Sequence, residues 1–99
     1  MSYSIIAKTK HGVAKEIPVS THDLFHKYWL PLFEKHEMIN LSNWKFPHDF
    51  EKDELKEIIT EWENLLPYIE GDWEKERANF ILHQLKSIKF EDYEYINFG

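Results

Sequence analysis

The stretch that decides the fold of this chain reads LKEIITEWENLLPYI and spans residues 55–69. Its apolar side chains recur three and four positions apart, so on a helix they fall within one stripe. They are Leu55, Ile58, Ile59, Trp62, Leu65, Leu66 and Ile69. This spacing predicts an amphipathic helix whose apolar side packs on the core.

One flank of this helix is acidic. Glu54, Glu57 and Glu61 stack there, and no Lys or Arg stands three or four positions from any of them. Like charges at this spacing cost roughly a few tenths of a kcal/mol per pair, which one Lys would relieve. Two interpretations stay open: a helix face kept charged for solubility, or a site for a cationic partner.

Composition narrows the class of protein. The 99 residues make one domain, 1–99, with a net charge of −6, and residues 50–70 alone carry two Lys against seven acidic groups. A surface with this excess of negative charge repels nucleic acid and attracts basic proteins. The chain has no Cys, and we find neither a signal peptide nor an apolar run long enough to span a bilayer. We therefore expect a cytoplasmic protein that binds neither nucleic acid nor membrane.

Residues 3–9 and 13–19 read as two strands joined by a three-residue loop that ends at Gly12. Glycine takes the positive φ that such a loop needs, and this loop length puts the apolar residues of both strands on one face. The expected pairs are Thr9 with Val13, Ile5 with Ile17, and Tyr3 with Val19.

A first helix is expected from the cap residue Ser20 to about His36, with a kink at Pro31 because proline removes one backbone hydrogen bond. Residues 38–49 show no clear period, and we interpret them as a connection pinned to the core by four apolar side chains. These are Ile39, Leu41, Trp44 and Phe46.

Asp49 is expected to cap the central helix, and Pro67 to end its regular part at Leu66. Asp72 is expected to cap a third helix. The core stripe of this third helix is expected to be Trp73, Phe80, Ile81, Leu85 and Ile88.

The tail, residues 90–98, is rich in strand formers and should return to the hairpin as a third strand. If Ile96 and Phe98 face the helices, Tyr93 and Tyr95 face away. The order ββαααβ predicts an α+β fold, with a small antiparallel sheet, made of the N-terminal hairpin and the C-terminal strand, packed against three helices.

Motifs for catalysis are scarce. His22 and His26 stand four apart, a spacing that lets two helical histidines reach one metal ion, but no third ligand is identifiable. There is no Cys nucleophile, no Gly-x-Ser-x-Gly and no phosphate-binding loop. We expect no metal site, no cofactor and no enzymatic activity, and a metal-dependent enzyme at His22 and His26 is the weakest alternative.

The leading hypothesis is a non-enzymatic acidic protein that blocks a basic partner, most concretely an inhibitor or immunity-type protein against a nuclease toxin. A nuclease must be positive where it holds phosphates, so an acidic domain with exposed Tyr suits it as a plug. The residues expected to bind the partner are Glu54, Glu57, Glu61, Asp92, Tyr93, Glu94 and Tyr95. The chain is similar to small acidic bacterial immunity proteins in size, charge and aromatic content, without a shared motif.

A second hypothesis is a structural or regulatory adaptor. It would act through a homodimer or a protein complex, using an exposed aromatic loop at residues 44–50. The two hypotheses differ in what they require, since the first depends on the acidic flank and the second on Trp44 and Phe46.

Overall fold

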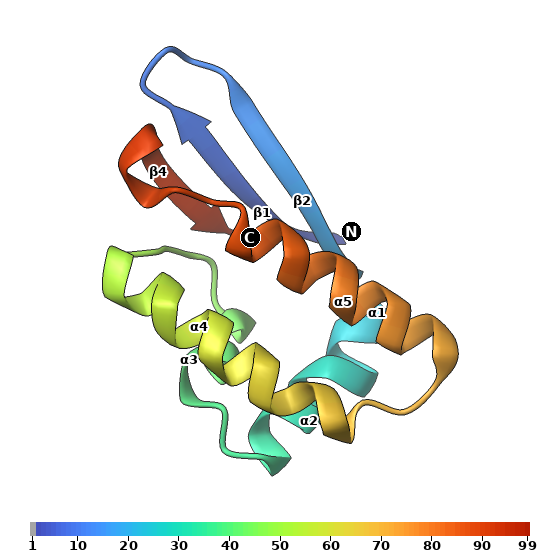
Figure 1. Ribbon diagram of the computed structural model, residues 1–99. Coiled ribbons are helices and arrows are strands. Elements are labelled where there is room, and N and C mark those ends of the chain that lie inside the picture. Colours follow the sequence, from blue (N-terminus) through green and yellow to red (C-terminus); the bar gives the residue numbers. More distant parts are fainter. Residues whose placement is uncertain (1) are drawn as a thin grey trace.

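The computed structural model describes residues 2–99, and the side chains of all of these except Lys45 and His48. The described strands form an antiparallel sheet in the order β2-β1-β4-β3, and helices pack against one of its faces (Figure 1). The predicted α+β class and the ββαααβ order are confirmed. The strands are β1 (Ser2–Thr9), β2 (Ala14–Thr21), β3 (His48–Asp49) and β4 (Tyr93–Phe98). The α-helices are α1 (His22–Leu24), α2 (Leu30–Lys35), α3 (Ile39–Ser42), α4 (Lys52–Leu65) and α5 (Asp72–Lys86).

The hairpin has the predicted loop and most of the predicted register. The Thr9 amide donates to the Val13 carbonyl at 2.8 Å, Gly12 has a φ of 86°, and Ile5 lies opposite Ile17. The predicted pairing of Tyr3 with Val19 is wrong. The register shifts between Tyr3 and Ser4, so that Tyr3 faces Ser20 and Ser4 faces Pro18. Pro18 has no N–H to continue the ladder, which explains a bulge at this point.

The first helix runs through Pro31, as expected, but begins one residue later than predicted. Thr21 is its cap, since its Oγ1 accepts a hydrogen bond from the Leu24 amide at 3.2 Å, and Ser20 belongs to β2. A π-helical segment (Phe25–Trp29) joins α1 to α2. The wider π turn comes just before Pro31 and accommodates the proline ring, which would crowd a regular helix.

Residues 38–49 are more regular than a connection. They form α3, a 3-10 turn (Asn43–Lys45) and β3, which adds a fourth strand that the sequence did not predict. Asp49 is therefore not the cap of α4; it lies in β3 and accepts a hydrogen bond from Asn97 at 3.0 Å, while Glu51 takes the cap position.

The apolar side chains of this segment divide into two pairs. Leu41 and Trp44 are fully buried, so the prediction that they pin the segment is confirmed. For Ile39 and Phe46 it is wrong, because these two side chains are 73% and 63% exposed. Trp44 belongs to the core, so it is not the exposed contact residue that the adaptor hypothesis for residues 44–50 requires.

Helix α4 lies at the centre of the core, as its spacing predicted. Trp62 is fully buried, with its ring 5.7 Å from that of Trp29 and 6.0 Å from that of Trp44. Its indole N–H donates to the Ala78 carbonyl of α5 at 2.9 Å. Burying a large apolar side chain contributes about 2–3 kcal/mol, so this aromatic cluster is a major source of stability. The other fully or largely buried positions of α4 are Leu55, Ile58 and Leu65.

The core stripe predicted for the third helix, α5, is only partly right. Ile81, Leu85 and Ile88 are buried as expected, but Trp73 and Phe80 are 56% and 41% exposed. Ala78 and Leu82 complete the buried side instead. Asp72 is the first residue of the helix rather than its cap, because Gly71, with a φ of 92°, holds the cap position.

The C-terminal strand β4 joins the hairpin, as predicted; it pairs with β1, and β3 pairs on its other side. Ile96 and Phe98 are fully buried, and Tyr95 faces away from the helices and is 40% exposed. Tyr93 differs from the prediction, since a register shift beside Thr9 turns this side chain so that it packs against the core. Residues Phe90–Asp92 form a 3-10 turn before the strand.

Candidate functional site

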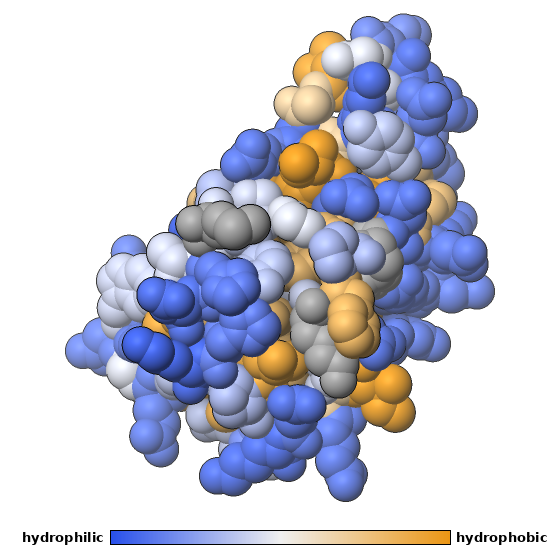
Figure 2. All heavy atoms as spheres, turned by 180° about the vertical axis from the view of Figure 1, so that it is seen from behind, coloured by the Kyte–Doolittle hydropathy of each residue, from blue (hydrophilic) through white to orange (hydrophobic). Residues whose placement is uncertain are grey.

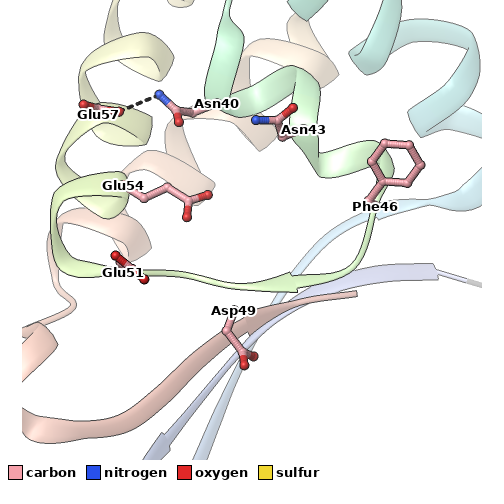
Figure 3. Close-up of a pocket in the computed structure, with 7 residues that line it drawn as sticks. All are labelled: Asn40, Asn43, Phe46, Asp49, Glu51, Glu54 and Glu57. Atoms are coloured by element: carbon pink, nitrogen blue, oxygen red, sulfur yellow. Dashed lines mark hydrogen bonds between the residues drawn. The ribbon is translucent and has the colours of Figure 1, made fainter.

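A groove of about 450 Å³ lies between α3, the first turns of α4 and β3 (Figure 3). We call it the acidic groove, because four of the seven described residues that line it carry carboxylates and none of those seven carries a positive charge. Its lining residues are Asn40, Asn43, Phe46, Asp49, Glu51, Glu54 and Glu57.

These carboxylates come from α4 with its cap residue and from β3. Glu54 and Glu57 are one turn apart on α4, Glu51 is the cap of that helix, and Asp49 comes from β3. Figure 3 shows the Glu54 side chain extending from α4 toward the segment that carries Asn43 and Phe46. Asp49 and Glu51 were missed as site residues because the sequence places them before the helix. Because β3 pairs with β4, the segment that carries Asp49 and Glu51 is fixed beside α4 and forms one side of the groove.

Glu61 has a structural role that the sequence did not predict. Its carboxylate accepts hydrogen bonds from the backbone amides of Asn40, at 3.1 and 3.2 Å, and of Leu41, at 3.1 Å. These amides belong to the first turn of α3, whose N–H groups have no partner within the helix. Glu61 therefore caps α3 from a neighbouring helix, and the partial positive charge of that helix end favours its carboxylate.

The Asn40 side chain lies between two carboxylates of the acidic flank, Glu57 and Glu61. Its amide nitrogen donates to Glu57 and to Glu61, at 2.8 Å each. This bridge offsets part of the repulsion expected between like charges one turn apart. Glu54 also has an interaction partner within the chain. Glu61 thus has a structural role besides the two interpretations, solubility or partner binding, that the sequence left open. The groups that bind Glu57 and Glu61 are neutral amides, so they do not neutralise the charge of either carboxylate.

The acidic groove adjoins the outer surface of β4. Asp49 also lines a hollow of about 340 Å³ together with Ile6, Tyr95 and Asn97. The two hollows therefore share one lining residue, Asp49. Among the lining residues described for the two hollows, the other expected partner-binding residues do not occur. Those are Glu61, Asp92, Tyr93 and Glu94.

The two histidines singled out in the sequence lie side by side. The His22 and His26 rings are 4.4 Å apart, and Tyr3 packs on both, with its hydroxyl 3.1 Å from His26 Nε2. Within residues 2–99, as far as side chains are described, no group of three or more His, Cys, Asp or Glu is placed to hold a metal ion.

Two sites outside the groove have shifted pKa values. Burial raises the pKa of Tyr28, whose hydroxyl donates to the Glu70 carbonyl and accepts from the Glu70 amide. At the start of α4, the hydrogen bond from Lys52, at 2.8 Å, lowers the pKa of Glu91, and Glu91 in turn raises the pKa of Lys52.

Comparisons of the chain with protein-family models, with curated proteins and with solved structures gave no significant match. No helix in the described part of the chain has the length and apolar character needed to cross a membrane. The acidic groove is the clearest candidate site in the described part of the chain, since it gathers four carboxylates and two side-chain amides around a space of about 450 Å³, wide enough for a Lys or Arg side chain.

Proposed function

We propose that this chain is a non-enzymatic binding protein whose acidic groove receives basic side chains of a protein partner. The observation that carries the proposal is that Glu51, Glu54 and Glu57, at the start of α4, and Asp49, in β3, line one groove. A concave surface lined by one sign of charge attracts ligands of the opposite sign and speeds their association. Arg fits such a site well, because it donates two parallel hydrogen bonds to one carboxylate.

The most concrete form of the proposal is an inhibitor or immunity-type protein, acting in the cytoplasm on a nuclease toxin. A nuclease holds phosphates with Lys and Arg, and carboxylates presented in a groove compete for the same side chains. Tyr95 supports the proposal, since it is exposed and lines a hollow with Asp49, and a Tyr adds contact area at low entropic cost. Figure 2 shows the rear surface as mostly hydrophilic, with hydrophobic residues in separate patches, which favours recognition steered by charge.

Charge reversal inside the groove tests the proposal. The variant Glu51→Lys with Glu57→Lys changes two exposed carboxylates and leaves the capping residue Glu61 intact. The control is Glu34→Lys with Glu37→Lys, because both residues are exposed on α2 and the turn after it, and the change in net charge is the same. Each tagged protein is used to capture partners from extract of the native cell at low and at high salt.

The expected result is a basic protein that wild type and control retain at low salt and that the groove variant loses. With the purified partner, the affinity of the groove variant should fall by about 10- to 100-fold at low salt, and high salt should weaken wild type as well. If the groove variant and the control bind the partner equally well, the groove is not the binding site.

A further inference from the structure

A second hollow, of about 530 Å³, lies next to the acidic groove between α3 and α4. Asn40 and Glu57 line both hollows, and Figure 3 shows this hydrogen-bonded pair at the end of the groove far from Asp49. The other described residues that line the second hollow are Ile39, Lys56, Thr60 and Glu61. Its lining residues on α4 stand about one helical turn, roughly 5 Å, beyond those of the groove.

The two hollows differ in charge. Four carboxylates and no basic side chain occur among the described lining residues of the acidic groove. In the second hollow Lys56 accompanies Glu57 and Glu61, and the Glu61 carboxylate already accepts the backbone amides of α3. A cation is therefore attracted more strongly to the groove, and the second hollow suits an uncharged side chain better.

The apolar side chain of the second hollow is exposed although its segment is held firmly. Ile39 is 73% exposed, the highest value among the large apolar side chains described. It is the first residue of α3, which Glu61 caps, and Leu41 of the same helix is fully buried. A single exposed apolar residue is ordinary, but this one stands beside a charged groove, and a segment already fixed loses little conformational entropy when a ligand covers it.

We propose that the second hollow is a subsite for an apolar side chain of the partner whose basic side chain enters the acidic groove. The inference rests on the proposed function and adds the kind of segment that is recognised. In an extended segment, residues i and i+2 lie on one face, roughly 6–7 Å apart, which suits two hollows about one helical turn apart. Charge brings the segment to the groove, and the contact with Ile39 distinguishes it from other basic segments.

Capped tripeptides test the subsite. Isotope-labelled protein is titrated at low salt with the amides of Arg-Gly-Leu, Leu-Gly-Arg and Arg-Gly-Gly, and the chemical shifts of the backbone amides are followed. The first two peptides present the same pair of side chains in the two chain directions. We expect all three to shift the amides of Glu54 and Glu57, which line the groove. One of the two peptides with Leu should also shift Ile39 and Thr60, and should bind about three- to tenfold more tightly than Arg-Gly-Gly.

The variant Ile39→Ser removes the apolar side chain of the second hollow and leaves every carboxylate in place. It should abolish the tighter binding of the peptide with Leu, while the affinity for Arg-Gly-Gly stays unchanged. Val13→Ser is the matched control, because Val13 is also β-branched and is 66% exposed in the loop between β1 and β2. This control should keep the difference between the peptides, and circular dichroism checks that both variants are folded.

The failure of the subsite and the failure of the proposed function give different results. If the Arg peptides shift the groove amides but Leu adds no affinity, or if Ile39→Ser keeps the difference between the peptides, the second hollow is not a subsite. The proposed function then stands without it. If none of the peptides shifts the amides of Glu54 and Glu57, the groove does not receive basic side chains, and the inference fails together with the proposed function.

Discussion

The two long helices, α4 and α5, are nearly equal in length and pack against each other, yet they are exposed in opposite ways. The tryptophan of α4, Trp62, is fully buried, and that of α5, Trp73, is 56% exposed. The rings of Trp29, Phe33 and Trp44 surround Trp62, whereas Trp73 stands in the first turn of α5, directly after the exposed residues Gly71 and Asp72. Whether an aromatic side chain on a helix is buried therefore depends on which segments the fold places beside it, and its spacing in the sequence alone does not predict its burial.

The largest difference in stability is expected between variants that truncate the tryptophan of α4 and the tryptophan of α5. Trp62→Ala should lower the free energy of unfolding by about 3–5 kcal/mol, because it opens a cavity between Trp29 and Trp44 and removes the hydrogen bond to Ala78. Trp73→Ala should cost less than about 1 kcal/mol, because this side chain is exposed. Urea denaturation followed by circular dichroism measures both values.

Equal losses for the two variants would contradict the comparison, since they would place Trp73 in the core.

Two glutamates of the acidic flank of α4, Glu61 and Glu57, should also differ in how much they stabilise the fold. Glu61→Ala should cost about 1–3 kcal/mol, because it leaves the first-turn amides of Asn40 and Leu41 without their acceptor. Glu57→Ala removes one exposed hydrogen bond, to the Asn40 side chain, and should cost less than about 0.5 kcal/mol. The same denaturation experiment decides the matter. Similar costs for the two variants would mean that Glu61 does not act as the cap of α3.

Tyr28 ties the first helix to the turn before α5 and should show a smaller, pH-dependent effect. Tyr28→Phe loses two hydrogen bonds with the Glu70 backbone and should cost about 1 kcal/mol at neutral pH. Burial raises the pKa of Tyr28 above 10.0, so the unfolded chain loses this proton first. The stabilisation is complete below pH 10.0 and decreases as the pH rises beyond it.

The gap in stability between wild type and Tyr28→Phe should therefore narrow in alkaline solution. Thermal unfolding at a series of pH values from neutral to strongly alkaline tests this, because effects of pH that are common to both proteins cancel in the difference. A gap that stays constant across the series would show that the Tyr28 hydroxyl has the same affinity for its proton in the folded and unfolded chain.

The sequence predicted the elements whose neighbours lie close along the chain or whose period is strong. The α4 stripe, the hairpin pairs Ile5–Ile17 and Thr9–Val13, and the inward side of β4 are of this kind. In each case one buried face and a local turn leave few alternatives.

Contacts between distant segments were not predictable in this way. The orientation of α5 depends on β2, which brings Pro18 to Arg77, and the role of Glu61 depends on α3, which brings Asn40 to it. The charge of the candidate site was visible in Glu54 and Glu57. Its shape was not, because Asp49 joins the groove only through β3, a strand of two residues that leaves almost no pattern in the sequence.

The smallest expected effect concerns the ion pairs at the two helices. Lys52, at the start of α4, contacts Glu91 at 2.8 Å, and Lys86, at the end of α5, contacts Glu63 at 3.0 Å. All four side chains are about half exposed or more, so neither pair should change the melting temperature by more than a small amount.

The Lys52–Glu91 pair can nevertheless be recognised by its pH dependence. The hydrogen bond from Lys52 lowers the pKa of Glu91 below its ordinary value of 4.5, so its contribution is present above pH 4.5 and is lost as the pH falls below it. The difference in melting temperature between wild type and Glu91→Gln should therefore be small near neutral pH, and should vanish in acid and in strong salt. Because Glu91 lies just before β4, a difference that persisted in acid would mean that this side chain stabilises the approach to β4 by packing, and that its charge has no part in it.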